Sequence, residues 1–199
     1  MRKIPILILV ISLCSASCSK KDYNIFIEAE SFSNKGGWII DPQFVEQMGS
    51  PYLIAHGLGK PVPDAETMIP VQQKGKYHIW VRTMNWSPGE WDAPGTFKVI
   101  VGGKELKDKL GTDVGWKWQY AGKTFIEDSL ILIGLHDMTG FDGRCDAIFL
   151  NTKKSLLRMS RMNLHFGEKS SLVKAIFLKK LFHSILLLSG AVLPAVLHR

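Results

Sequence analysis

Short runs of strand-forming residues, separated by Gly, Pro, Asn and Asp, fill the part of the chain between residues 22 and 152. Tyr77, Ile79 and Val81 occupy alternate positions in one of them, the period of a strand with one buried face. No stretch keeps a 3.6-residue apolar period long enough for a core helix. The clearest runs are residues 24–30, 76–83, 97–101, 129–136 and 145–150. The pattern predicts an all-β sandwich of two antiparallel sheets.

Turn residues between the runs predict how the strands are connected. Gly102 and Gly103 interrupt the run from Val101 to Leu106, and two glycines supply the positive φ angles of a tight hairpin. The longest loops are expected at residues 36–49, 57–66 and 85–95.

The N-terminal segment, residues 1–21, has the pattern of a bacterial export signal. A basic start precedes the apolar run 4–13, which is too short for a membrane span of about 20 residues. Small residues then lead to Cys18, as in a loose lipobox, so we expect Cys18 to be lipidated and residues 19–22 to form a tether. This predicts a cell-envelope or outer-membrane lipoprotein. Simple cleavage, giving a periplasmic or secreted protein, is the alternative.

The C-terminal segment, residues 153–199, differs in composition from the body. Basic and apolar residues alternate at roughly helical spacing, with nine Lys or Arg and the single acid Glu168. A membrane-surface helix would explain this pattern. We prefer the alternative that the reading frame of a longer gene was interrupted and these residues are an unselected extension.

The charge distribution argues against nucleic-acid binding by the body. The chain has a formal net charge of +7, but residues 22–152 hold twelve Lys or Arg against seventeen Asp or Glu, so the basic surplus is terminal. Of the three cysteines, only Cys145 lies in the body, which excludes a disulfide framework. Its apolar run predicts a buried, unreactive thiol.

Three segments resemble carbohydrate-binding module families six and thirty-five, which have a galactose-binding-like jelly-roll fold. They are Glu28-Ala29-Glu30, Gly75-Lys76-Tyr77 with Arg82, and Cys145-Asp146-Ala147-Ile148. Longer runs resemble the N-terminal module of Bacteroidetes proteins described as FAD-dependent oxidoreductases or xanthan lyases. These runs are residues 28–32, 36–38, 48–53, 55–59 and 136–146. The resemblance implies a glycan-binding module.

The resembled oxidoreductases continue into a large cofactor-binding domain, for which this chain has no room. Only about 47 residues follow Thr152, without a Gly-x-Gly-x-x-Gly turn between strand and helix. We therefore expect no FAD site here. The alternative function is that of a detached N-terminal fragment of an oxidoreductase or xanthan-lyase-type enzyme, in which the module packs on a missing catalytic domain.

Carboxylates suggest a structural calcium site. Glu28 and Glu30 lie two apart on one expected strand and share a face, and the resemblance places Asp146 on the neighbouring closing strand. Three converging carboxylates repel each other without a cation, and hard oxygen ligands suit Ca²⁺. The alternative is that Glu28 and Glu30 are solvated or paired with Arg144.

Tryptophans in or beside loops suggest where a sugar would bind, because indoles can stack on the apolar faces of sugar rings. Trp86 and Trp91 are the leading candidates, followed by Trp116, whereas Trp38, Trp80 and Trp118 are expected in the core. Loop tryptophans also cap the ends of sandwiches, which is the competing interpretation.

Polar residues before the last strand complete the candidate site. His136, Asp137 and Arg144 could form a ligand-binding cluster with His56 and Asp142, although loop-fixing hydrogen bonds are the favoured role. No nucleophile elbow or zinc-protease motif is present, so we expect no catalysis in this chain. A small esterase or lyase using His136 and Asp137 is the weakest hypothesis. The expected partners are a polysaccharide or oligosaccharide, an absent catalytic domain, and a membrane reached through the lipid anchor or the tail.

Overall fold

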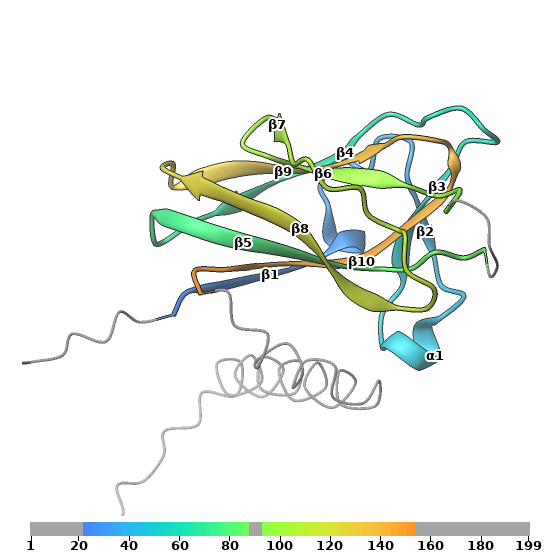
Figure 1. Cartoon of the computed structure of the whole chain (residues 1–199), viewed down its shortest axis with the longest axis horizontal. Coiled ribbons are helices and arrows are strands. Elements are labelled where there is room, and N and C mark those ends of the chain that lie inside the picture. The colour runs from blue at the N-terminus through green and yellow to red at the C-terminus, as the bar shows by residue number, and fades with distance from the viewer. Residues whose placement is uncertain (1–21, 88–92, 154–199) are drawn as a thin grey trace, which may run out of the picture.

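Two antiparallel sheets face each other in the computed structural model, which describes residues 22–87 and 93–153 (Figure 1). The six-stranded sheet consists of β2 (Ile39–Asp41), β3 (Tyr52–His56), β10 (Phe141–Asn151), β5 (Gly75–Thr83) and β8 (Lys117–Ile126), with β1 (Asn24–Glu28) beside β10. The four-stranded sheet consists of β4 (Ala65–Pro70), β9 (Leu130–Asp137), β6 (Phe97–Val101) and β7 (Lys104–Glu105). The prediction of an all-β sandwich is confirmed.

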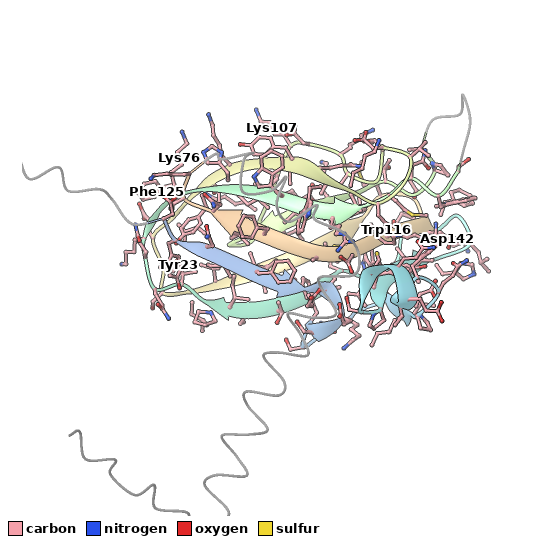
Figure 2. All side chains as sticks on the ribbon, turned by 90° about the horizontal axis from the view of Figure 1, so that it is seen from below. Tyr23, Lys76, Lys107, Trp116, Phe125 and Asp142 are labelled. Atoms are coloured by element: carbon pink, nitrogen blue, oxygen red, sulfur yellow. The ribbon has the colours of Figure 1, made fainter. Side chains whose placement is uncertain are left out.

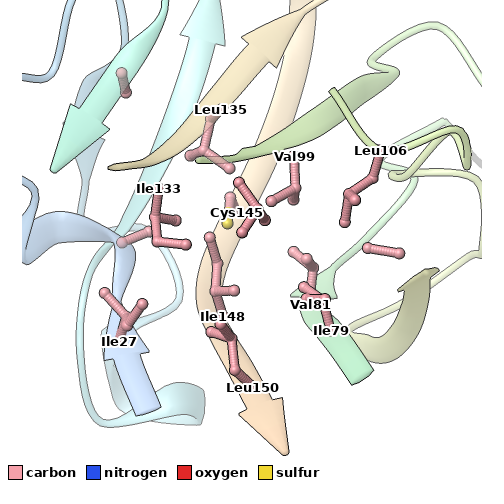
Figure 3. Packing of buried hydrophobic residues seen from close by; sticks show 14 of the residues in the cluster. Ile27, Ile79, Val81, Val99, Leu106, Ile133, Leu135, Cys145, Ile148 and Leu150 are labelled. Carbon is pink, nitrogen blue, oxygen red and sulfur yellow. The ribbon is translucent and has the colours of Figure 1, made fainter. Parts of the chain in front are cut away.

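The core between the sheets follows the alternation seen in the sequence. Tyr77, Ile79 and Val81 of β5 are fully buried in the main cluster, because successive side chains of a strand point to opposite faces. Figure 3 shows Cys145 among these apolar side chains. Burial, together with nearby carboxylates, raises the pKa of the Cys145 thiol well above its usual value. The prediction of a buried thiol is confirmed.

The β6–β7 hairpin also forms as expected. Gly102 and Gly103 have φ angles of 59° and 76°, the left-handed conformation that a primed two-residue turn requires.

The loop expected at residues 36–49 is only partly a loop. Ile39–Asp41 pairs with β3 as an edge strand, and the short helix α1 (Val45–Met48) places Met48 against Tyr52. Neither element was predicted, because three-residue strands and one-turn helices are too short to show a period. Within the described part of the chain, no helix is long and apolar enough to cross a membrane.

The first and last strands lie side by side, as the resemblance implied. Glu28 at the end of β1 faces Ala147 of β10 in an antiparallel register. The chain then turns into the 3₁₀ helix η1 (Ala29–Ser31), so Glu30 is not on the strand. The expectation that Glu28 and Glu30 share one strand face is therefore wrong.

The sandwich has two distinct ends. Asn24 pairs with Asn151 at the end where the described chain enters and leaves the fold, and Gly75 lies beside Asp22 and Thr152 at the same end. His56 and Phe141 pair at the opposite end, where the β3–β4, β5–β6, β7–β8 and β9–β10 connections gather. We call this opposite end the loop end. Figure 2 shows Trp116 and Asp142 on this side and Tyr23 on the other.

Candidate functional site

Trp86 lies at the loop end with a fixed but accessible indole. Its Nε1 donates a hydrogen bond of 2.8 Å to the Phe141 carbonyl, and the side chain remains 38% exposed. The guanidinium carbon of Arg144 lies over the ring, 5.8 Å from its centroid. Trp86 and Arg144, two of the predicted ligand-binding residues, are therefore in contact.

Arg144 projects from β10 on the face of the six-stranded sheet that points away from the core. It pairs across the strands with Ile54 and is only 9% exposed. Its Nε and Nη1 atoms are buried and have no hydrogen-bond partner among the described residues.

Tyr52 connects Arg144 to a carboxylate. Its hydroxyl donates a 2.6 Å hydrogen bond to Oδ2 of Asp41. Burial raises the pKa of Tyr52 to about 12; the hydrogen bond to Asp41 adds to the rise, while a hydrogen bond with Arg144 opposes it. The phenol therefore stays neutral and keeps donating to Asp41.

Trp116 packs on the other side of Tyr52. The two ring centroids are 5.0 Å apart, and Phe44 closes the cluster at 5.9 Å from both rings. The Trp116 indole Nε1 is buried and has no hydrogen-bond partner within residues 22–87 and 93–153. Trp86, Arg144, Tyr52 and Trp116 thus form a continuous series of contacts, which we call the aromatic–arginine row.

Exposed apolar side chains surround Trp86. Phe141 is 50% exposed and its ring covers Gly59, where an added Cβ would lie 2.9 Å from the ring. Leu58 is 81% exposed on the β3–β4 loop, and Val114 is exposed where it bridges to Asn85, next to Trp86. The loop end therefore presents an apolar surface with a fixed indole at its edge.

Sequence reasoning missed Tyr52, Asp41 and Phe44 as parts of the row. Tyr52 lies within the run 48–53 that carries the resemblance, and Asp41 and Phe44 carry no signal of their own in the sequence. Their roles depend on the β2–β3 pairing and on α1, neither of which the sequence pattern revealed.

The expected single cluster of histidines and carboxylates does not form. His56 Nδ1 meets Asp142 at 2.5 Å, whereas His136 Nδ1 meets Asp64 at 2.9 Å. These are two separate pairs, because His56 and Asp142 lie on β3 and β10 of the six-stranded sheet, whereas His136 lies on β9 of the four-stranded sheet.

Asp137 faces the interior of the loops rather than a ligand. It is 1% exposed, and its carboxylate accepts hydrogen bonds from the backbone N–H groups of Val62, Thr139 and Gly140. This is the loop-fixing role favoured from the sequence. Its inclusion as a ligand-binding residue is corrected, since no carboxylate oxygen is exposed to a ligand.

Asp146 is fully buried and forms an ion pair with Arg82, with 3.2 Å between Oδ2 and Nη1. It occupies a β-bulge of β10, because Cys145 faces Thr83 while Ala147 already faces Arg82. The bulge turns its carboxylate toward the face of Arg82.

The three predicted calcium ligands nevertheless lie in one neighbourhood. Asp146, Glu30 and Glu28 all contribute to the raised pKa of the Cys145 thiol. Among the described residues, however, no three His, Cys, Asp or Glu side chains form a group that could hold a metal ion. Asp146 pairs with Arg82, and calcium binding by the three carboxylates stays a prediction.

The tryptophans expected in the core divide into two groups. Trp38 is 2% exposed and packs edge-on against Phe97 in the main core. Trp80 is also buried, but it belongs with Trp118 and Phe149 to a second cluster on the outer face of the six-stranded sheet. Trp91 and Cys18 lie outside the described residues.

Comparisons with known proteins identify the same fold. A GH26-CBM35 β-(1,4)-mannanase of Podospora anserina matches 64% of this chain with a TM-score of 0.51 and 16% identity, over 27% of its own length. A family 35 carbohydrate-binding module of Clostridium thermocellum matches 63% of this chain at a TM-score of 0.51 and 17% identity, over 97% of its length. The CBM35 of Paenibacillus barcinonensis matches 63% of this chain with a TM-score of 0.50 and 13% identity, over 97% of its own length.

No protein-family model and no curated protein matches the sequence. At these identities, the structural similarity establishes a fold shared with carbohydrate-binding modules.

Proposed function

We propose that residues 22–152 form a non-catalytic module that binds glycan at the loop end. The observation that supports this most directly is the state of Trp86, whose indole is held by the Phe141 carbonyl yet remains 38% exposed. An aromatic ring fixed in this way can stack on a sugar without losing side-chain freedom on binding. The exposed Phe141 ring extends the apolar surface, and the mannanase and module similarities in fold agree with this function.

The place where the described part of the sandwich begins suits an anchored module. Asn24 pairs with Asn151 at the end opposite the loops, where Figure 2 shows Tyr23. A lipid on Cys18 or a tether to the cell envelope would therefore leave the loop end directed away from the attachment point. We propose an exported protein of this kind, acting with a polysaccharide-processing enzyme.

The alternative is that the module belongs to a longer oxidoreductase or xanthan-lyase-type protein and packs on its catalytic domain. Its motif resemblance supports this, and the family 35 module of the mannanase likewise forms only part of its chain. Sequencing downstream of the Thr152 codon tests it, because a cofactor-domain reading frame there would favour the packing role over free glycan binding.

Replacing Trp86 with Ala tests glycan binding. We expect the affinity for polysaccharide to fall about tenfold or more, as for a central aromatic contact. Affinity gel electrophoresis across plant and microbial polysaccharides measures this. Phe125→Ala is the matched control, since Phe125 is 65% exposed on β8 near the opposite end. The proposed function would be contradicted if the wild type, with folding verified by circular dichroism, migrated equally in gels with and without each polysaccharide.

Calcium at Glu28, Glu30 and Asp146 stays a prediction, which thermal melting tests. If Ca²⁺ binds there, we expect it to raise the melting temperature and EDTA to reverse the rise, with both effects lost in Glu28→Gln. No change in the melting temperature on either addition would contradict the site and leave Arg82 as the partner that neutralises Asp146.

A further inference from the structure

The outer face of the six-stranded sheet carries aromatic side chains where an outward-facing sheet surface usually carries polar ones. Phe26 remains 44% exposed there, and Phe125, on the same face of β8, is 65% exposed. Exposed aromatic patches of this kind mark surfaces that contact a partner protein or a membrane. The aromatic residues in contact with one another on this face are Phe26, Trp80, Trp118, Tyr120 and Phe149.

Two exposed lysines lie on the same face. Lys76 is opposite Phe125, and Lys123 is opposite His78, in the β5–β8 register. Tyr77 fills the core, so its neighbours Lys76 and His78 point outward. In the half of this face that lies away from the loop end, the outward side chains of the described strands include no carboxylate. We call this half the basic–aromatic face, and it consists of Phe26, Lys76, His78, Trp80, Tyr120, Lys123, Phe125 and Phe149.

The proposed lipid anchor would bring this part of the sandwich to a membrane. Asp22 follows Cys18 by four residues, which gives a reach of at most about 14 Å. The Asp22 carboxylate pairs with Lys153, 2.8 Å from its Nζ, at the end of the sandwich where Figure 2 shows Tyr23 and Lys76. A chain lipidated at Cys18 is therefore held with this end close to the bilayer.

The charges favour one orientation at the bilayer surface. The β8–β9 turn crosses between the two sheets at this end and carries Glu127 and Asp128, both exposed. An upright sandwich would direct these carboxylates at anionic phosphates. A sandwich that lies on the basic–aromatic face directs Lys76 and Lys123 at them instead, and lysines near an anionic membrane surface are attracted to it. Aromatic side chains are also favoured at the level of the lipid headgroups.

From this arrangement we infer that the basic–aromatic face binds the surface of a bilayer containing anionic phospholipid, so that the anchored module lies flat on it. Phe26 and Phe125 enter the headgroup region. Lys76 and Lys123 contact lipid phosphates, and the loop end stays open to glycan at the side. The inference rests on the proposed anchoring at Cys18 and adds a second contact with the membrane.

Two indole probes in the full chain test the orientation. Phe125→Trp adds an indole to the basic–aromatic face, and Met68→Trp adds one to the outer face of the four-stranded sheet, where Met68 is 49% exposed. The lipidated protein is reconstituted in vesicles of phosphatidylethanolamine and phosphatidylglycerol with brominated acyl chains, which quench nearby indoles. After subtraction of the wild-type signal, we expect quenching of the indole added by Phe125→Trp and none of that added by Met68→Trp.

Paired lysine substitutions test the role of charge. In the full chain with Cys18→Ser, which removes the acylation site, Lys76→Gln with Lys123→Gln is expected to lower the affinity for these vesicles about 25-fold, because each lysine near an anionic surface contributes roughly fivefold. Lys60→Gln with Lys104→Gln is the control, since it removes the same charge from the β3–β4 loop and β7, and its affinity should change less than about twofold. Sedimentation with sucrose-loaded vesicles measures binding, and thermal melting verifies folding.

The outcomes separate this inference from the anchoring on which it rests. Equal quenching of the two added indoles, or an equal loss of affinity in the two lysine pairs, would overturn the inference. Shielding of the indole added by Phe125→Trp from iodide without vesicles would also overturn it, because another segment or a second copy would then cover the face. If mass spectrometry found no lipid on Cys18, the proposed anchoring would fall, whereas vesicle binding that still depended on Lys76 and Lys123 would support the inference.

Discussion

Asp146→Ala is expected to lower the free energy of unfolding by about 3–5 kcal/mol, because it leaves the charge of Arg82 without its buried partner. Asp146 is fully buried, and the Arg82 side chain is only 11% exposed, so water cannot readily replace the lost carboxylate. The Ser50 hydroxyl, 3.4 Å from Oδ1, would lose its acceptor as well. Urea denaturation followed by tryptophan fluorescence measures the change.

An exposed ion pair provides the control for this experiment. Lys98 and Glu105 lie 3.1 Å apart on the β6–β7 hairpin, in contact with solvent, and Lys98→Ala should leave the unfolding curve nearly unchanged. The double substitution Arg82→Met with Asp146→Leu should recover much of the lost stability, since it removes both charges together. An effect of Asp146→Ala no larger than that of Lys98→Ala would show that Arg82 finds another partner.

The sequence predicts the parts of the fold that depend on local patterns of residues. The alternation of Tyr77, Ile79 and Val81 identifies the buried face of β5, and Gly102 with Gly103 identifies the hairpin, because both depend only on neighbouring residues. The resemblance adds the pairing of the first and last strands, which no local pattern reveals.

Single-residue irregularities explain much of what the sequence does not predict. The bulge at Asp146 directs its carboxylate to Arg82, and the turn at η1 takes Glu30 off the strand. Both irregularities change which side chains meet but leave the apolar pattern unchanged. The sequence and the resemblance could therefore place the three carboxylates in one region of the fold, but could not give their contacts.

The residues of the candidate site could be predicted from the sequence, but the contacts between them could not. Trp86, Trp116 and Arg144 could be nominated from residue type and position near loops. Their connection through Tyr52 depends on β3 lying beside β10 and on the short helix α1, which brings Phe44 against Tyr52 and Trp116. Such contacts arise from register and packing between segments far apart in the chain, which residue spacing does not encode.

Asp137→Ala is expected to cost about 3–5 kcal/mol of stability and to weaken glycan binding together with it. The carboxylate accepts from Val62 N–H on the β3–β4 loop and from Thr139 and Gly140 N–H on the β9–β10 loop, so its loss leaves buried donors unsatisfied in both loops. Those loops carry Leu58 and adjoin Phe141, and their loosening should disturb the surface around Trp86. Urea denaturation and affinity gels on the same samples measure the two effects.

The neighbouring residue supplies the control. His136 points to the opposite face of β9, is 38% exposed and contacts Asp64, so His136→Ala should change neither stability nor binding appreciably. The stability and glycan affinity of Asp137→Asn should lie between those of Asp137→Ala and His136→Ala, because asparagine keeps the size and one carbonyl acceptor. If Asp137→Ala kept its stability but lost glycan affinity, the carboxylate would have to contact the ligand directly. A parallel loss of both would instead mean that it serves binding by holding two loops in register, as its burial and three backbone partners indicate.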